Sequence, residues 1–280
     1  MRVYHLRTLA EFNRFKDATK TSYTKHLYEI EDTRPKTDMP FSVNGYSYTA
    51  GECVDFECDF RWGNGFPSVN WRERVVCPKT KLNNRMRGSI HAADMFLDIY
   101  DNSRIFLMEQ TTPLYKFYHK RYANAIGSEY LGNLVPKGAV DQRGIRNEDA
   151  TSLTFEDASI DIILSFDVFE HIPNFKAAFS ECFRVLSENG RMLFSVPFSE
   201  NSEANITRAV VQDDGSIQHL LPAEYHGDPV GAGGILCYRN YGWEMLNDLL
   251  DIGFSDAYAI TFWSKEMGYY TRQYQFVAEK

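Results

Sequence analysis

The stretch SFDVFEHIP, residues 165–173, places two carboxylates and an imidazole directly after the apolar run IDIIL. The run predicts a buried strand, and ionisable groups at the end of a buried strand are typical of a binding or catalytic site. His171 is therefore a candidate general base. The alternative is that His171 only holds the loop through a buried hydrogen bond.

A second group that can do acid–base chemistry lies in the stretch PAEYHGDPVGAGG, where His226 stands two residues before Asp228 among glycines and prolines. A histidine in such a loop is exposed enough to take a proton from an acceptor hydroxyl, with the aspartate orienting the ring. The alternative is that His226 and Asp228 stabilise the loop. His226 and His171 are thus rival candidates for the base.

The elements that must position these residues alternate along the chain. Apolar runs predict strands at 104–109, 125–131, 144–149, 159–166 and 191–198, and a final antiparallel pair at 255–263 and 272–280. Amphipathic stretches predict helices at 112–124, 174–189 and 240–254, with Thr112 and Asn174 as caps and Gly190 and Gly253 at the ends of the last two. The alternation predicts an α/β fold: a doubly wound, mostly parallel, seven-stranded Rossmann-like sheet.

Acidic side chains recur where these strands end. The residues concerned are Glu109 with Gln110, Glu129, Asp149, and Asp167 with Glu170. The carboxyl ends of parallel strands meet at one edge of the sheet, and carboxylates there can accept hydrogen bonds from ribose hydroxyls or an adenine amino group. A single one of these acids can be a solvated loop residue, but their recurrence predicts a bound nucleoside.

Residues 150–198, from ATSLTFEDASIDIIL through SFDVFEHIP to RMLFSVPF, resemble the core of class I S-adenosylmethionine-dependent methyltransferases. In that family an acidic strand end is followed by an E-H-[IV] element, an amphipathic helix and a strand ending near proline. Looser similarity extends from about Arg85 to Lys280. The resemblance implies S-adenosylmethionine as cofactor, with Asp149 at the adenine, Glu129 at the ribose, and Phe166 and Asp167 beside the methionine part. It also implies cofactor contacts from Glu109, Gln110, Thr111, Tyr130 and Ala150.

The first strand departs from the family pattern. A glycine-rich ExGxG loop is expected there, but the chain reads MEQTTPLYKF, without glycine. Either the loop binds the methionine carboxylate through Thr111, Thr112 and the following helix N-terminus, or cofactor binding has been lost and the chain is a non-catalytic binding protein. A third possibility, another nucleotide on the same fold, lacks the GxGxxG fingerprint of dinucleotide binding.

Residues 1–84 are predicted to form a separate unit: a helix within the first 40 residues, then small strands, with residues 85–280 as the methyltransferase domain. The similar branch of the family carries a zinc-ribbon-like unit here, with GYCxxCG and CPxCxxNxR elements. In this chain Ser47, Ala50 and Thr80 stand where three of those cysteines are expected, so a degenerate unit without metal is predicted. A zinc site made of Cys53, Cys58, Cys77 and His91 is the alternative.

Composition limits the possible partners. Thirty basic against thirty-eight acidic residues give a net charge of -8, which disfavours broad contact with nucleic acid. The sequence has no apolar run long enough for a membrane span and no secretory-type apolar N-terminus, so we expect a cytoplasmic location and no membrane partner. Five cysteines, an odd number, suit a reducing compartment.

The expected activity is methyl transfer to a hydroxyl, or another nucleophile, of a sugar, glycan or small metabolite. Proteins of the similar branch share the E-Q-x-T-P element, GSEYLG and a HGDP loop, and their genes often lie near polysaccharide or secondary-metabolite genes. The insertion at 199–239 is expected to form much of the acceptor pocket.

Overall fold

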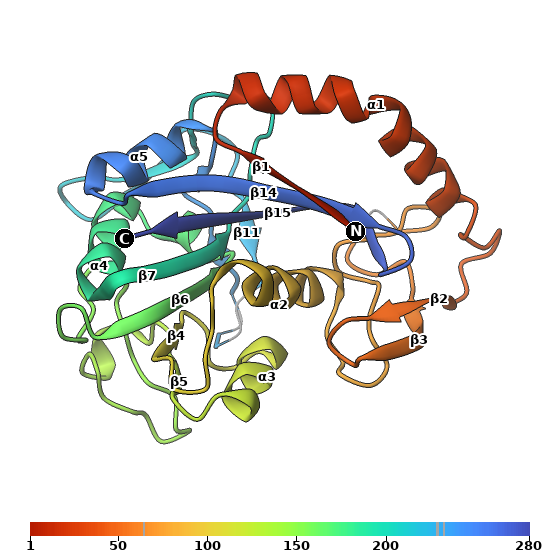
Figure 1. Ribbon diagram of the computed structural model, residues 1–280. Helices are drawn as coiled ribbons and strands as arrows, with labels where there is room; N and C mark the ends of the chain where they lie inside the picture. Colours follow the sequence, from red (N-terminus) through yellow and green to blue (C-terminus); the bar gives the residue numbers. More distant parts are fainter. Residues whose placement is uncertain (64, 228–229, 232) are drawn as a thin grey trace. The chain divides into compact units, whose positions relative to one another are not determined.

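The computed structural model describes residues 1–280 except 64, 228–229 and 232, and it divides into two compact units (Figure 1). The first unit comprises Met1–Leu6, Ala10–Asp98 and Ala259–Gln275, and the second comprises Arg7–Leu9, Ile99–Tyr258 and Phe276–Lys280. The boundary predicted near Asn84 falls inside the first unit, at the start of helix α2 (Asn84–Phe96). Among the described residues, no helix is both long and apolar enough to cross a membrane.

The main sheet has seven strands in the order β1-β14-β15-β7-β6-β4-β5. Their bounds are β1 Arg2–Leu6, β14 Asp256–Ser264, β15 Tyr269–Glu279, β7 Leu186–Ser195, β6 Ile160–Phe166, β4 Ile105–Leu107 and β5 Ala125–Gly127. β7, β6, β4 and β5 pair in parallel, whereas β15 with β7 and β1 with β14 are antiparallel. This mixed Rossmann-like sheet with flanking helices confirms the predicted fold class.

One strand of the sheet was predicted wrongly. The run at 144–149 contributes two isolated bridges, a parallel one between Asn147 and Glu129 and an antiparallel one between Arg146 and Val140. Asn147 turns its side-chain amide to the carbonyls of Gly132 and Val135, so it secures a loop. The seventh strand is instead β1, where a helix was expected. Its Tyr4 stacks on Trp263 of β14 at 5.7 Å between ring centroids, and this long-range pairing outweighs the local helical pattern.

Capping residues set the starts of two helices in the second unit. α3 (Pro113–Arg121) begins after Thr112, whose hydroxyl accepts from the Tyr115 N–H at 3.2 Å, and α4 (Phe175–Val185) begins after Asn174, as predicted. α4 packs against β7 and against α5 (Glu244–Ile252). α5 ends at Gly253, with φ at 128°.

The predicted end of α4 at Gly190 was wrong. The helix stops at Val185 because Leu186 already pairs with Ile160 of β6. Asn189, not Gly190, takes the left-handed conformation, with φ at 62°. Gly190 is required for space instead, since a Cβ there would lie 2.8 Å from the Ser187 carbonyl oxygen.

The remaining elements of the second unit are short. Two 3₁₀ turns, Gly132–Leu134 and η2 (Phe169–His171), follow the strands β5 and β6 in the chain. The insertion after β7 forms three two-stranded ribbons: β8 Ile206–Thr207 with β13 Arg239–Asn240, β9 Ala209–Val211 with β10 Ile217–His219, and β11 Tyr225–His226 with β12 Ile235–Leu236.

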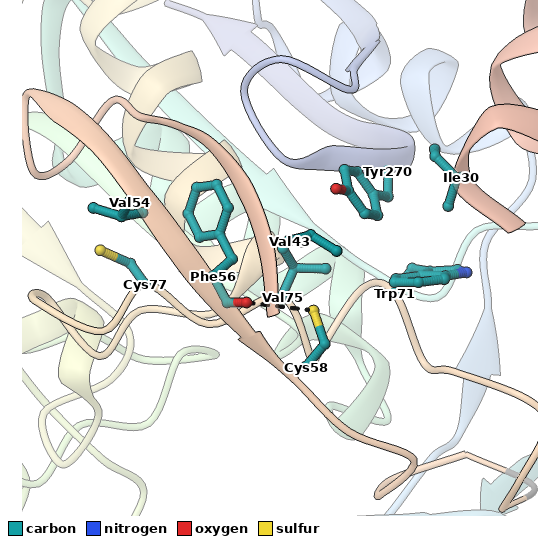
Figure 2. Packing of buried hydrophobic residues seen from close by; sticks show 9 residues of the cluster. All are labelled: Ile30, Val43, Val54, Phe56, Cys58, Trp71, Val75, Cys77 and Tyr270. Carbon is teal, nitrogen blue, oxygen red and sulfur yellow. Dashed lines mark hydrogen bonds between the residues drawn. The ribbon is translucent and has the colours of Figure 1, made fainter. Parts of the chain in front are cut away.

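The first unit contains α1 (Leu9–Glu31), α2 and, where small strands were predicted, the hairpin of β2 (Phe41–Ser47) and β3 (Glu52–Cys58). Figure 2 shows its core, in which Phe56 of β3 lies between Val54 and Val75. Arg87 is fully buried over the Phe56 ring and donates to the Val75, Met267 and Gly268 carbonyls. A buried cation bound by three carbonyl oxygens stabilises this packing.

The cysteines of this unit do not gather as the zinc alternative requires. Within the described residues, neither group of three potential metal ligands contains Cys53, Cys58, Cys77 or His91. Cys53 is exposed, and burial raises the pKa of Cys58 to about 12. Ser47, which stands at one expected cysteine position, donates its hydroxyl to the Cys77 sulfur at 3.4 Å. A hydroxyl therefore lies where the zinc-ribbon pattern has a second thiol.

Candidate active site

Glu109, Glu129 and Asp167 follow β4, β5 and β6, three parallel strands that end at one edge of the sheet (Figure 1). Glu109 and Glu129 are each only 8% exposed. Carboxylates are rarely buried unless they have hydrogen-bond or charge partners. The sheet therefore brings these strand-end acids to the edge at which α/β proteins bind ligands.

Glu129 organises the loop that lacks glycine. Its Oε1 accepts hydrogen bonds from the Gln110 N–H at 2.8 Å, the Thr111 N–H at 2.9 Å and the Thr111 hydroxyl at 2.8 Å. The sequence predicted that Thr111 would donate to the methionine carboxylate of the cofactor. In the structure its N–H and hydroxyl instead donate to Glu129, a carboxylate of the chain itself. Thr112 is likewise used as the cap of α3.

Gln110 uses its side chain for the same loop region. Its Oε1 accepts from the Arg146 N–H at 2.7 Å, and its Nε2 donates to the Gly144 carbonyl at 2.8 Å. These bonds tie the segment after β4 to the segment that precedes Asp149. Gln110 therefore positions backbone around the candidate site.

Asp149, the predicted adenine contact, and Tyr130, another predicted cofactor contact, both lie in the segment that follows β5. Asp149 Oδ1 accepts from the Thr151 N–H and hydroxyl at 2.9 and 2.6 Å, and Lys137 lies 3.4 Å from Oδ2. Burial opposes ionisation, but these partners outweigh it and hold the pKa of Asp149 below its usual value. Ala150 follows it and is half-buried. Tyr130 is 63% exposed and lines a hollow of about 290 Å³ with Leu134 and with Val230 of the insertion.

Phe166 and Asp167 occupy the end of β6. Phe166 is buried, and Asp167 takes the left-handed conformation with φ at 57°. Its N–H donates to the Ser195 carbonyl, and its Oδ1 accepts from the Ser195 hydroxyl, both at 2.9 Å. A non-glycine residue in this region is strained, so the bonds to β7 hold Asp167 in place at the strand end.

The two rival bases lie side by side. The rings of His171, in η2, and His226, in β11, have centroids 4.9 Å apart. Between them is Glu170, whose side chain is fully buried; its Oε1 lies 3.4 Å from His226 Nδ1 and 3.7 Å from His171 Nε2. Sequence reasoning placed Glu170 among the strand-end acids but did not connect it with His226.

Asp228, the predicted orienting residue for His226, lies outside the described residues. Glu224 is positioned to act in that way, because its Oε1 lies 3.0 Å from His226 Nε2. The hydrogen bond to Glu170, together with Glu224 and against the effect of burial, raises the pKa of His226 to about 9. Burial raises the pKa of Glu170. In this arrangement His226 keeps its proton at neutral pH, so it donates rather than accepts.

Comparison with known proteins matches residues 111–194 to the family model described as a methyltransferase domain. Over 53 residues the chain is 42% identical to a probable S-adenosylmethionine-dependent methyltransferase of Mycolicibacterium smegmatis. That match covers 19% of this chain and 21% of the relative, so the chain aligns with about a fifth of the relative's length.

Two solved structures are similar at low identity. An S-adenosylmethionine-dependent methyltransferase from Mesorhizobium loti is 14% identical, with a TM-score of 0.42 over 68% of this chain and 96% of that one. A possible histamine N-methyltransferase from Thermotoga maritima is 12% identical, with a TM-score of 0.42 over 70% and 89%. The matched segment 111–194 runs from the loop after β4 into β7 and contains Glu129, Asp149 and the Glu170–His171 pair. Residues 111–194 are thus similar to a methyltransferase domain, in agreement with the resemblance to class I S-adenosylmethionine-dependent methyltransferases drawn from the sequence.

Proposed function

We propose that the chain transfers a methyl group from S-adenosylmethionine to a hydroxyl of a sugar, glycan or small metabolite. The observation that carries the proposal is the pattern of hydrogen bonds that the Glu129 carboxylate accepts. In the described part of the chain, the hydrogen bonds that this carboxylate receives all end on Oε1. Oε2 is left to accept from the ribose hydroxyls of a nucleoside at the carboxyl edge of β5.

The loop after β4 fits this role in spite of its lost glycines. Glycine serves in such loops by letting the backbone approach a ligand closely. Here Glu129 fixes the Gln110–Thr111 backbone from within, so the loop is held without a glycine turn. Gly127 allows close packing within the protein, because a Cβ at that position would lie 2.7 Å from the Glu109 carbonyl oxygen.

Methyl transfer requires the protein mainly to align the acceptor with the methyl group, because the sulfonium of S-adenosylmethionine is already activated. Holding the acceptor oxygen in line with the methyl carbon is worth about 7 to 11 kcal/mol. The insertion is placed to supply this alignment: β11 brings His226 to Glu170, next to the end of β6, and Val230 lines the hollow beside Tyr130. Charged and polar groups at that point suit a hydroxylated acceptor.

A non-catalytic binding protein is the second candidate, and one observation favours it. The Thr111 N–H and hydroxyl are both bonded to Glu129, so the expected donors for the methionine carboxylate are occupied. Binding of S-adenosylmethionine would then require other donors or a rearranged loop.

Calorimetric titration with S-adenosylmethionine and, separately, S-adenosylhomocysteine distinguishes the two candidates. We expect micromolar binding, weakened about 10- to 100-fold by Glu129→Gln, because one charged hydrogen bond contributes about 1.5 to 3 kcal/mol. Glu188→Gln is the matched control, since Glu188 is an exposed residue of β7. Absence of binding at millimolar ligand, or equal affinity in Glu129→Gln, would reject the proposed cofactor site.

A further inference from the structure

We propose that Glu170, His171 and His226 bind a divalent transition-metal ion of the Zn²⁺ type. The binding itself does not depend on the proposed methyl transfer; only the role given to the ion below does. The three side chains come from the 3₁₀ turn after β6 and from β11 of the insertion, so the site forms only when the insertion folds against the sheet edge.

The distances suit ligands of a single ion. Oε1 of Glu170 lies 3.4 Å from His226 Nδ1 and 3.7 Å from His171 Nε2, and one ligand atom from each residue lies within 4.8 Å of the others. Tetrahedral Zn²⁺ with bonds of about 2.0 to 2.1 Å separates its ligand atoms by about 3.3 Å. The three atoms therefore need only small movements to surround the ion.

Both imidazoles are oriented by acceptors on their far nitrogens. His171 Nδ1 lies 2.8 Å from the Leu236 carbonyl oxygen, and His226 Nε2 lies 3.0 Å from Glu224 Oε1. A carbonyl or carboxylate oxygen only accepts, so each of these nitrogens carries the hydrogen. When a metal ion replaces the proton on His226 Nδ1, the lone pairs of His171 Nε2 and His226 Nδ1 both face Glu170. Metal-binding histidines are typically held in this way, by a carboxylate or a backbone carbonyl.

Glu170 supplies a second, independent observation. Its side chain is 0% exposed, and among the described residues Oε2 has no hydrogen-bond partner, while Oε1 has the contact with His226 Nδ1 at 3.4 Å. A buried carboxylate is costly without such partners. Two imidazole lone pairs facing it add repulsion unless a cation lies between them. A proton on His226 satisfies only the contact between His226 and Glu170, whereas a metal ion bonds to Glu170, His171 and His226 together.

The neighbouring group of Glu224, His226 and Cys237 is a weaker candidate. The Cys237 thiol donates to the Arg239 carbonyl at 3.2 Å, and burial raises its pKa to about 11. A metal binds the thiolate, which this environment disfavours. Glu224 is better placed to orient His226 than to bind the ion.

Two imidazoles and one carboxylate favour Zn²⁺, Fe²⁺ or Mn²⁺ over Mg²⁺ or Ca²⁺, which prefer oxygen ligands. Such a site keeps an open position, and an acceptor hydroxyl bound there has a lowered pKa. Its proton passes to solvent water, the oxygen forms the bond to the methyl carbon, and the electrons of the carbon–sulfur bond return to sulfur to give S-adenosylhomocysteine. His226 is then a ligand rather than the base.

The test is calorimetric titration of the chelator-treated 280-residue chain with ZnCl₂, without S-adenosylmethionine or acceptor. We expect one Zn²⁺ per chain, with affinity reduced at least tenfold in His171→Ala and in His226→Ala. His219→Ala is the matched control, because His219 is an exposed histidine of the same insertion. Circular dichroism and melting curves check that the variants fold, and Glu170→Gln, a near-isosteric change, provides a third variant if either alanine variant does not.

Binding of no Zn²⁺, or binding that the three cluster variants leave unchanged, would overturn the proposal. A loss that is equal in His219→Ala would also overturn it. Because S-adenosylmethionine is titrated separately into the same stripped protein, failure of the metal site and failure of the cofactor site give different results.

Discussion

Replacing Glu170 by glutamine should change the titration of His226 in metal-free protein. The substitution keeps the size of the buried side chain but removes its charge. Since the hydrogen bond to Glu170 is the largest cause that raises the pKa of His226 to about 9, we expect that pKa to fall toward 6.5 in the variant.

The size of the fall follows from the geometry. Unit charges 3.4 Å apart interact by about 5 kcal/mol at an effective dielectric constant of about 20. Burial of His226 opposes part of this attraction, and Glu224 remains 3.0 Å from the other ring nitrogen in the variant. A fall of the His226 pKa from about 9 all the way to 6.5 is therefore an upper limit. We expect a decrease of about one to two pKa units, or about 1.4 to 2.7 kcal/mol.

The same group makes stability depend on pH. The pKa of His226 is higher in the folded chain than in the unfolded one, so its contribution is fully present below about pH 6.5 and is lost as the pH rises through about 9. Over that window the unfolding free energy of the wild type should fall by about 1.4 to 2.7 kcal/mol relative to Glu170→Gln.

NMR titration of the histidine ring protons measures the pKa directly, with His226→Asn to assign the resonance and chelator present throughout. Denaturant melts at pH 6.5 and pH 9 measure the stability difference. A pKa of His226 that is the same in wild type and Glu170→Gln would refute the assignment of Glu170 as its main partner.

Three further substitutions test local features. Thr111→Val removes the hydroxyl that donates to Glu129, so we expect about 1 kcal/mol lower stability in denaturant melts and weaker S-adenosylmethionine binding by calorimetry; unchanged values would remove Glu129 as organiser of the loop. Thr112→Ala removes the cap of α3, and thermal melts should show a loss of about 1 kcal/mol, whereas no loss would mean that the cap contributes nothing. Gly253→Ala forces a side chain into a backbone with φ at 128° and against Phe183, so melts should show a loss of more than about 1 kcal/mol; a stabilised variant would contradict the strain.

Local signals in the sequence predicted much of the fold. Thr112, Asn174 and Gly253 act through hydrogen bonds or backbone angles within one helical turn, so their roles can be read from neighbouring residues. The buried run of β6 is apolar over most of its length and is equally clear. Long-range pairing decided the misassigned segments: β1 is a strand because β14 offers it an edge, and Leu186 leaves the helix because β6 pairs with it.

The candidate site was predictable in part. Acids at the ends of parallel strands follow from the alternation of elements, which is why Glu129 and Asp167 could be proposed; Asp149 was proposed on the same ground, although the run that it ends is not a strand. That Glu129 receives its hydrogen bonds from the Gln110–Thr111 loop depends on how β4 and β5 align, and no local pattern encodes it. The contact between Glu170 and His226 depends on the path of an irregular insertion, which has no periodicity to read.

The most direct measurement of the cofactor site is a crystal structure of the chain with S-adenosylhomocysteine. We expect the nucleoside at the carboxyl edge of β4 and β5, with a ribose hydroxyl at hydrogen-bond distance, about 2.5 to 3.0 Å, from Glu129. A ligand bound elsewhere, or a ribose that makes no contact with Glu129, would contradict the proposed site.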